Sequence, residues 1–159
     1  MSRNSEMGIH FYMVECDSKG IVASDATELD LEESFEGLTY MKADGLNNFG
    51  KSRVYTEKFA DSDRLRVYLP ETPLREQTTA TLSFVFVGEN RYSSYKQFID
   101  YVSSGFHRYR DNARNKYLYF YIESEIKPAK ELLYGGTPYL TLDLQVKNIF
   151  GQTFDEPII

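Results

Sequence analysis

The sequence predicts a mainly β fold of the α+β class, in which an antiparallel sheet carries one amphipathic helix. Three observations predict it. Residues 78–87 alternate apolar and polar side chains, which is typical of a half-buried strand. Residues 94–104 then place apolar side chains at helical spacing, and residues 139–147 alternate again. Strands on both sides of one helix therefore define the second half of the chain.

Shorter alternating runs complete the predicted sheet. We expect a first strand at 9–14 and a long one at 117–126. Residues 52–57 and 64–69 alternate on either side of the polar turn 60–63, so they predict a hairpin. In the last strand the side chains expected to point inward are Leu140, Leu142, Leu144 and Val146.

The predicted helix has clear boundaries. Ser94 followed by Gln97 fits a capping box, and Gly105 suits the left-handed position after the last turn. A helix of about three turns is not stable alone in water, so it must pack on the sheet. The face that would do so consists of Tyr95, Phe98, Ile99 and Val102.

Composition limits the class of protein. The 159 residues are enough for a single domain, 1–159, with its own core. A net charge of −6 argues against a dedicated nucleic-acid binder, whose affinity depends on lysine and arginine. The single cysteine, Cys16, excludes an internal disulfide and a cysteine-based zinc site.

Three segments are expected to lie outside the regular fold. Residues 1–7 and 152–159 are predicted to be loose ends. Residues 24–50 are the candidate for a long extended loop, and the wider segment 15–49 contains nine acidic side chains and two lysines. The start of the chain has no apolar signal segment, and no apolar run has the length of a membrane span. We therefore expect synthesis in the cytosol and no membrane partner.

Motifs for catalysis are absent from the sequence. His10 and His107 are the two histidines, and neither belongs to a metal-binding spacing motif. Phosphate-binding glycine loops and serine-elbow motifs do not occur. A pair of carboxylates for glycoside hydrolysis stays open, since any acidic domain offers such pairs. We expect no catalytic residue, no cofactor and no metal, and therefore no enzyme.

A basic cluster at 107–116 contrasts with the acidic segment. A nucleic-acid contact, a solvated loop and a contact between subunits are three interpretations of it. The third fits both segments, because a basic loop of one copy can meet the acidic segment of the next. The residues of this hypothetical contact are Arg108, Arg110, Arg114 and Lys116 on the basic side and Glu28, Asp30, Glu32, Glu33 and Glu36 on the acidic side.

The strand that begins at Tyr117 is apolar or aromatic on both faces. Leu118, Phe120 and Ile122 alternate with its tyrosines. One face can pack on the domain's own core, and the other must be covered by the chain's own loops or by a neighbouring subunit. The tyrosines, which we add to the hypothetical subunit contact, are Tyr117, Tyr119 and Tyr121.

Residues 78–151 resemble tail proteins of long-tailed bacteriophages. The likeness rests on the helix segment 92–102, on Tyr109-Arg110-Asp111, on the 117–122 strand and on residues 128–144. This segment is similar to the N-terminal barrel of distal tail proteins and to the related tail tube proteins. The N-terminal half of the chain matches this pattern less well, and we expect no further C-terminal domain of the kind that many distal tail proteins have.

The resemblance implies a split β-barrel or sandwich with a flanking helix. It also implies a structural protein of the virion tail that assembles with itself, as a hexameric ring or tube, around a channel through which DNA passes unbound. Other tail proteins would be its further partners, and residues 24–50 would reach a neighbour. The alternative is a monomeric β-barrel module that binds a small molecule or carbohydrate on its tyrosines.

Overall fold

The computed structural model describes residues 3–51, 55–58, 65–68 and 75–158. Their order is short α1 (Arg3–Glu6), β1 (Phe11–Cys16), β2 (Leu29–Asp30), α2 (Leu31–Ser34), β3 (Leu38–Asp44), β4 (Tyr55–Lys58), β5 (Leu65–Tyr68), β6 (Thr78–Val87), α3 (Arg91–Val102), β7 (Phe106–Asp111), β8 (Tyr117–Tyr121), β9 (Lys130–Tyr134) and β10 (Thr137–Asn148). The prediction of a mainly antiparallel β fold of the α+β class is confirmed.

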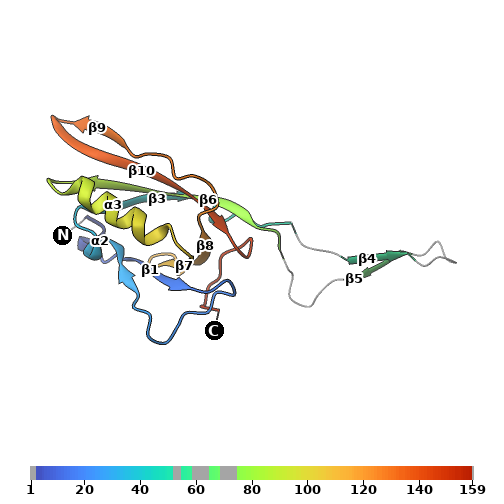
Figure 1. Cartoon of the computed structure of the whole chain (residues 1–159). Coiled ribbons are helices and arrows are strands. Elements are labelled where there is room, and N and C mark those ends of the chain that lie inside the picture. Colours follow the sequence, from blue (N-terminus) through green and yellow to red (C-terminus); the bar gives the residue numbers. More distant parts are fainter. Residues whose placement is uncertain (1–2, 52–54, 59–64, 69–74, 159) are drawn as a thin grey trace.

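The main sheet is antiparallel and strongly bent (Figure 1). Its strands follow the order β2-β1-β7-β8-β10-β6-β3, and β9 adds to β10 beyond the end of β8. The longest ladder joins β6 to β10, and it pairs Phe84 with Leu142 and Leu82 with Leu144. Directly opposed side chains point to the same face, so this ladder builds one wall of the core.

Helix α3 covers the inner face of the sheet (Figure 1). Phe98 and Val102 have no exposed surface, and the Phe98 ring contacts the rings of Phe84 and Phe35. The helix begins three residues before the prediction. The N–H of Ser94 already donates to the carbonyl of Asn90, so Ser94 lies inside the helix and cannot cap it. The helix ends at Val102, two residues earlier than expected.

Residues 24–50 are not an extended loop, which corrects the prediction. They form β2, α2 and β3 and pack on the main body. The physical reason is that three widely spaced apolar residues are buried core side chains: Leu31, Phe35 and Leu38. The acidic side chains between them occupy the solvent side of the same short elements, as in any amphipathic segment.

Both chain ends are also more ordered than predicted. Asn4 in α1 donates from its side-chain amide to Glu32 and to the carbonyl of Tyr40. At the other end, Phe154 forms a β-bridge with Tyr117, and the N–H of Ile158 donates to the Tyr119 hydroxyl. The ends 3–7 and 152–158 therefore pack on the fold rather than hang free.

The hairpin predicted in the middle of the chain is present. β4 and β5 pair antiparallel, with Tyr55 opposite Tyr68, in a separate sheet. Figure 1 shows them away from the main sheet, and the predicted turn 60–63 lies outside the described residues. At the base of this arm the N–H of Gly50 donates to Gly151, and the N–H of Glu76 donates to Lys51. Gly151 has φ +65°, and a Cβ there would lie 2.0 Å from the Glu76 carbonyl oxygen.

Candidate functional site

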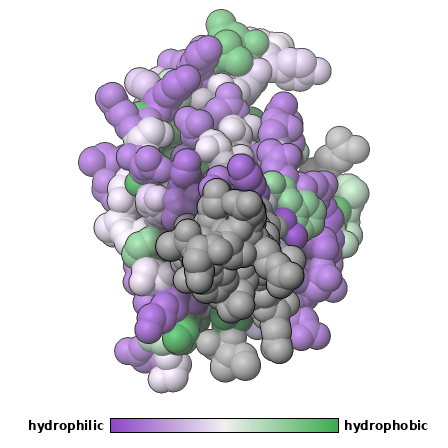
Figure 2. Space-filling view, turned by 90° about the vertical axis from the view of Figure 1, so that its right-hand side faces the viewer, coloured by the Kyte–Doolittle hydropathy of each residue, from purple (hydrophilic) through white to green (hydrophobic). Residues whose placement is uncertain are grey.

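One end of the sheet exposes apolar side chains. β9 is solvent-exposed along its whole length, and Leu133 and Tyr134 are 73% and 79% exposed. Figure 2 shows a hydrophobic group standing at the top, where Figure 1 places the β9–β10 hairpin. A strand with one paired edge and one open edge exposes a row of backbone groups that can pair with another chain. We call the outer side of β9 the β9 edge.

The β9 edge is held in place by helix α3. Arg91 donates to Glu131 at 2.8 Å, and the Tyr92 hydroxyl donates to the same carboxylate at 2.6 Å. These two bonds lower the pKa of Glu131, and the carboxylate in turn raises the pKa of Tyr92. The hairpin turn is Gly135-Gly136, and both residues have positive φ, as a two-residue hairpin requires.

β3 forms the opposite edge of this half of the sheet. Its first part is covered, because Asn4 and Glu32 bond the backbone carbonyl and N–H of Tyr40. A register shift between Tyr40 and Lys42 follows, and Met41 at that bulge is 59% exposed. We call residues 41–44 the β3 edge, because within the described residues β3 ends the strand order there.

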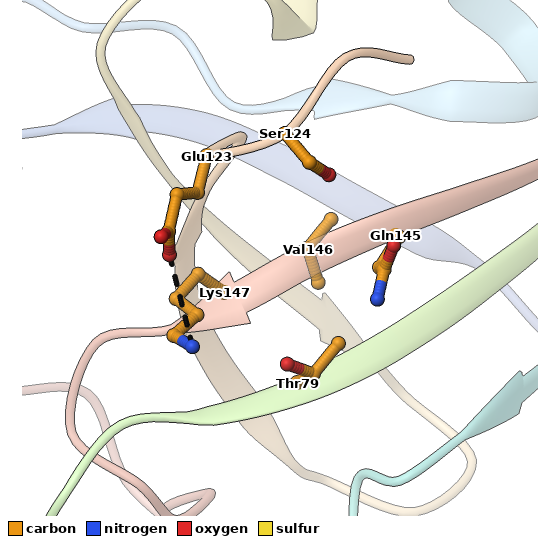
Figure 3. A pocket seen from close by; sticks show the side chains of 6 residues that line it. All are labelled: Thr79, Glu123, Ser124, Gln145, Val146 and Lys147. Carbon is orange, nitrogen blue, oxygen red and sulfur yellow. Dashed lines mark ion pairs between the residues drawn. The ribbon is translucent and has the colours of Figure 1, made fainter. Parts of the chain in front are cut away.

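The outer face of β6 and β10 is open and polar. Ser83 donates to Asp143 at 2.7 Å across this face. A groove of about 410 Å³ lies between it and the segment after β8, with Lys147 and Glu123 at one end (Figure 3). A second groove of about 360 Å³ continues along the same face past Gln145 to Lys130.

Arg108 and Arg110 of the predicted contact meet Glu28 within one chain. Arg108 donates to Glu28 at 2.9 Å, and the Arg110 Nε donates at 3.0 Å. Burial alone would raise the pKa of Glu28, but the hydrogen bonds from both arginines hold it below its usual value. The basic cluster is therefore not a loop in its first half: β7 is a strand between β1 and β8 whose inward side chains are His107, Tyr109 and Asp111.

The other two cations of the predicted contact also have partners in the chain. Arg114 pairs with the buried Asp111 at 2.9 Å, and Lys116 pairs with Asp155. Arg114 further donates to the Tyr40 hydroxyl at 3.2 Å. A role between subunits for these side chains stays a hypothesis, although each cation is already neutralised within the chain.

Most acidic residues of the predicted contact have partners within the chain. Asp30 pairs with His10, and Glu36 accepts from Asn90 beside helix α3. Glu32 supports β3, and Glu33 is exposed on α2. Their contribution to a subunit contact likewise stays a hypothesis.

The outer face of β8 is covered by the chain's own C-terminal segment. Tyr119 has no exposed surface, and its ring packs edge-on against Phe150 and Phe154. Tyr117 and Tyr121 are half-buried, and Tyr121 donates to Gln77. These tyrosines therefore do not form an open aromatic platform.

The two histidines occupy different environments. His107 is fully buried between Tyr101 and Phe120, and burial lowers its pKa. His10 precedes β1, and its Nδ1 lies 2.8 Å from Asp30 Oδ2, with the carboxylate of Glu33 close by. The sequence showed no metal spacing here, because three separate elements supply the side chains.

Comparisons with known proteins find no match that identifies a family for this chain. No protein-family model and no curated protein matches the chain. Among solved structures, the Dit (gp 19.1) protein of phage SPP1 aligns with a TM-score of 0.40 and 12% identity over 85% of this chain. That protein is described as a paradigm of the hub adsorption apparatus in phages that infect Gram-positive bacteria. The chain spans 49% of that protein's length, and we draw no argument from so distant a likeness. In the described residues no helix is long and apolar enough to cross a membrane.

Proposed function

We propose that this protein is a structural subunit of a phage tail that assembles with copies of itself into a closed ring or tube. The observation that supports the proposal is the pair of open edges on one curved half-sheet, β9-β10-β6-β3. Successive strands alternate in direction, so β9 and β3 run antiparallel to each other. A copy rotated about an axis roughly along the strands would therefore place its β3 edge antiparallel to the β9 edge of its neighbour.

Such a contact joins two different surfaces, one from each partner. A contact of this kind closes into a ring when the rotation fits and otherwise continues as a filament. The exposed apolar side chains Leu133 and Met41 would be removed from water at each contact, and the open backbone groups would find partners. The sequence resemblance to tail tube and distal tail proteins supports the setting that we propose: a virion tail, a hexameric ring and a channel for DNA.

The polar outer face of β6 and β10 suits the channel. A continuous sheet that closes on itself turns one face toward its axis, and the inner face here is filled by α3 and the core. Residues of the outer face would then meet the passing DNA: Thr79, Thr81, Ser83, Thr141, Asp143, Gln145 and Lys147. These side chains are mostly neutral, so the outer face offers few cations that could bind the phosphates of DNA.

The runner-up, a monomeric module with an aromatic binding platform, has less support. Tyr119 is buried under the C-terminal segment, and none of the three β8 tyrosines lines the grooves of the described outer face.

Electron microscopy and light scattering on two edge variants test the proposal. Leu133→Lys places a charge on the β9 edge, and Met41→Lys places one on the β3 edge; both positions are exposed, so the fold is expected to persist. Each variant alone should stay monomeric at concentrations where the wild type forms rings or tubes. Ile21→Lys, at an exposed apolar position away from both edges, is the matched control and should assemble normally.

A mixture of the two edge variants sharpens the result. Each variant keeps one intact edge, so a mixture can form a single β9–β3 contact and should stop at dimers. A contact of β9 with β9 would instead let Met41→Lys pair with itself. Unchanged assembly of both single variants, or a wild type that remains monomeric at high concentration, contradicts the proposal.

A further inference from the structure

Three side chains that could bind a metal meet on the side of the molecule where α2 joins the sheet. His10, Asp30 and Glu33 each offer one ligand atom, and these three atoms lie within 4.8 Å of one another. The first two are already in contact, with 2.8 Å between His10 Nδ1 and Asp30 Oδ2. None of the three residues belongs to the β9 edge, to the β3 edge or to the lining of the polar grooves.

The chain fixes the position of His10 from its backbone. The N–H of His10 donates to the side-chain oxygen of Asn112 at 2.8 Å, and its carbonyl accepts from the N–H of Asn112 at 3.2 Å. Asn112 also donates to the carbonyl of Gly8. The residues before β1 are therefore tied to the end of β7, and the imidazole projects from a supported position rather than from a free terminus.

Asp30 and Glu33 are presented by two consecutive short elements. Asp30 ends β2, paired with Tyr12 of β1, and its Oδ1 accepts from the N–H of Glu32. This bond orients the carboxylate and leaves Oδ2 for His10. Glu33 follows in the single turn of α2 and is exposed, so its side chain can change rotamer at little cost. The fixed His10–Asp30 pair and the Glu33 side chain, which can change rotamer, together resemble an incomplete metal site.

The distances suit a transition-metal ion. Ligand atoms with bonds of about 2.0 Å to Zn²⁺ stand about 3.3 Å apart in a tetrahedral site. The ligand atoms of His10 and Asp30 must move apart by a few tenths of an ångström. A change of rotamer must bring the Glu33 carboxylate closer to them. One imidazole nitrogen with two carboxylate oxygens is a donor set for Zn²⁺, Ni²⁺ or Co²⁺, whereas Mg²⁺ prefers oxygen ligands alone.

We propose that His10, Asp30 and Glu33 form a surface site for a divalent transition-metal ion such as Zn²⁺, with water completing its coordination. The side chains of His10 and Asp30 remain 28% and 12% exposed, so an ion can enter from solvent. The bound ion would neutralise two carboxylates and clip the start of β1 to α2. Its role would be structural, since it would join segments 20 residues apart beside the sheet edge.

Calorimetry and thermal unfolding with ZnCl₂ test this inference on the chelator-treated full chain. We expect one Zn²⁺ per chain and a rise in Tm of about 5–10 °C at a free metal concentration 100 times Kd. MgCl₂ at the same concentration should leave Tm unchanged. Glu33→Gln and His10→Gln should each weaken Zn²⁺ binding at least tenfold, whereas Asp25→Asn, an exposed carboxylate in the same acidic region, should not.

NMR provides an internal control, because the chain contains two histidines. Zn²⁺ should shift the ring signals of His10 and leave those of the buried His107 in place. The inference is overturned if the wild type shows no saturable Zn²⁺ binding below millimolar concentration, or if both ligand variants bind as tightly as the wild type. In either case His10 and Asp30 are an ordinary hydrogen-bonded pair, and the assembly proposed above is unaffected.

Discussion

The two halves of the main sheet differ in how completely the chain covers them. In the half formed by β1, β7 and β8, the core fills the inner face, and Phe150 and Phe154 cover part of the outer face over Tyr119. In the half formed by β9, β10, β6 and β3, helix α3 covers the inner face and the outer face is open (Figure 1). A sheet that its own chain covers on one face alone suits contact with something else.

The charges follow the same division. In the closed half, Arg108 and Arg110 are satisfied by Glu28, and Asp111 is satisfied by Arg114. In the open half, most outward side chains are hydroxyls, amides or a lone carboxylate bonded to serine. The charged groups named in the closed half are therefore paired within the chain, and we place both the proposed assembly contacts and the channel face in the open half.

A matched pair of tyrosine substitutions should give the largest contrast between the halves. Tyr119→Ala removes a fully buried ring and the hydroxyl that accepts from Ile158, so we expect a loss of about 3–5 kcal/mol in the free energy of unfolding. Tyr134→Ala, on the exposed β9 edge, should change it by less than about 0.5 kcal/mol. Chemical denaturation measures both, and similar losses would remove the distinction between the halves.

Strands with clear alternation could be predicted from the sequence, and those with charged or sparse apolar residues could not. The bounds of β6 were predicted at 78–87 as observed, because its apolar residues recur without interruption. β7 was missed as a strand, although Phe106-His107-Arg108-Tyr109-Arg110-Asp111 also alternates, because cations occupied one face. An alternation of buried and charged residues was the signal that could have revealed it.

Long-range pairing explains the remaining errors. Nothing local in residues 24–50 shows that Leu31, Phe35 and Leu38 reach a core built from β6 and α3. Partners distant in sequence likewise determine which side chains the basic cluster contacts, since Glu28 lies 80 residues before Arg108. The His10–Asp30–Glu33 cluster is invisible to spacing rules for the same reason. The exposed strand β9 could not be predicted, because its sequence lacks an alternating pattern.

Removing the Glu28 carboxylate in the closed half should lower the free energy of unfolding by less than Tyr119→Ala does. Glu28→Gln leaves two partly buried arginines without a negative partner, and we expect a loss of about 1–3 kcal/mol in the free energy of unfolding. Asp100→Asn, which breaks the exposed pair with Lys96, is the matched control and should cost less than about 0.5 kcal/mol. An equal loss for both variants would mean that Glu28 is no more than a surface charge.

The smallest expected effect is a pH dependence that originates in the closed half. Burial lowers the pKa of His107 in the folded chain below the ordinary value of about 6.5, while nearby Glu15 and a backbone hydrogen bond with Tyr101 act in the opposite direction. The unfolded chain then binds a proton that the folded chain does not, and stability should fall as the pH drops below about 6.5. The loss amounts to about 1.4 kcal/mol for each unit by which the pKa is lowered.

His107→Phe isolates this contribution. Phenylalanine keeps a ring between Tyr101 and Phe120 but cannot take up a proton. The free energy of unfolding of the variant should therefore rise relative to that of the wild type as the pH falls from 7 to 5, as measured by urea denaturation. The carboxylates titrate at lower pH and are common to both proteins, so they cancel in the comparison. A constant difference across this range would show that His107 is protonated equally in both states, and that the interior beneath β7 admits water.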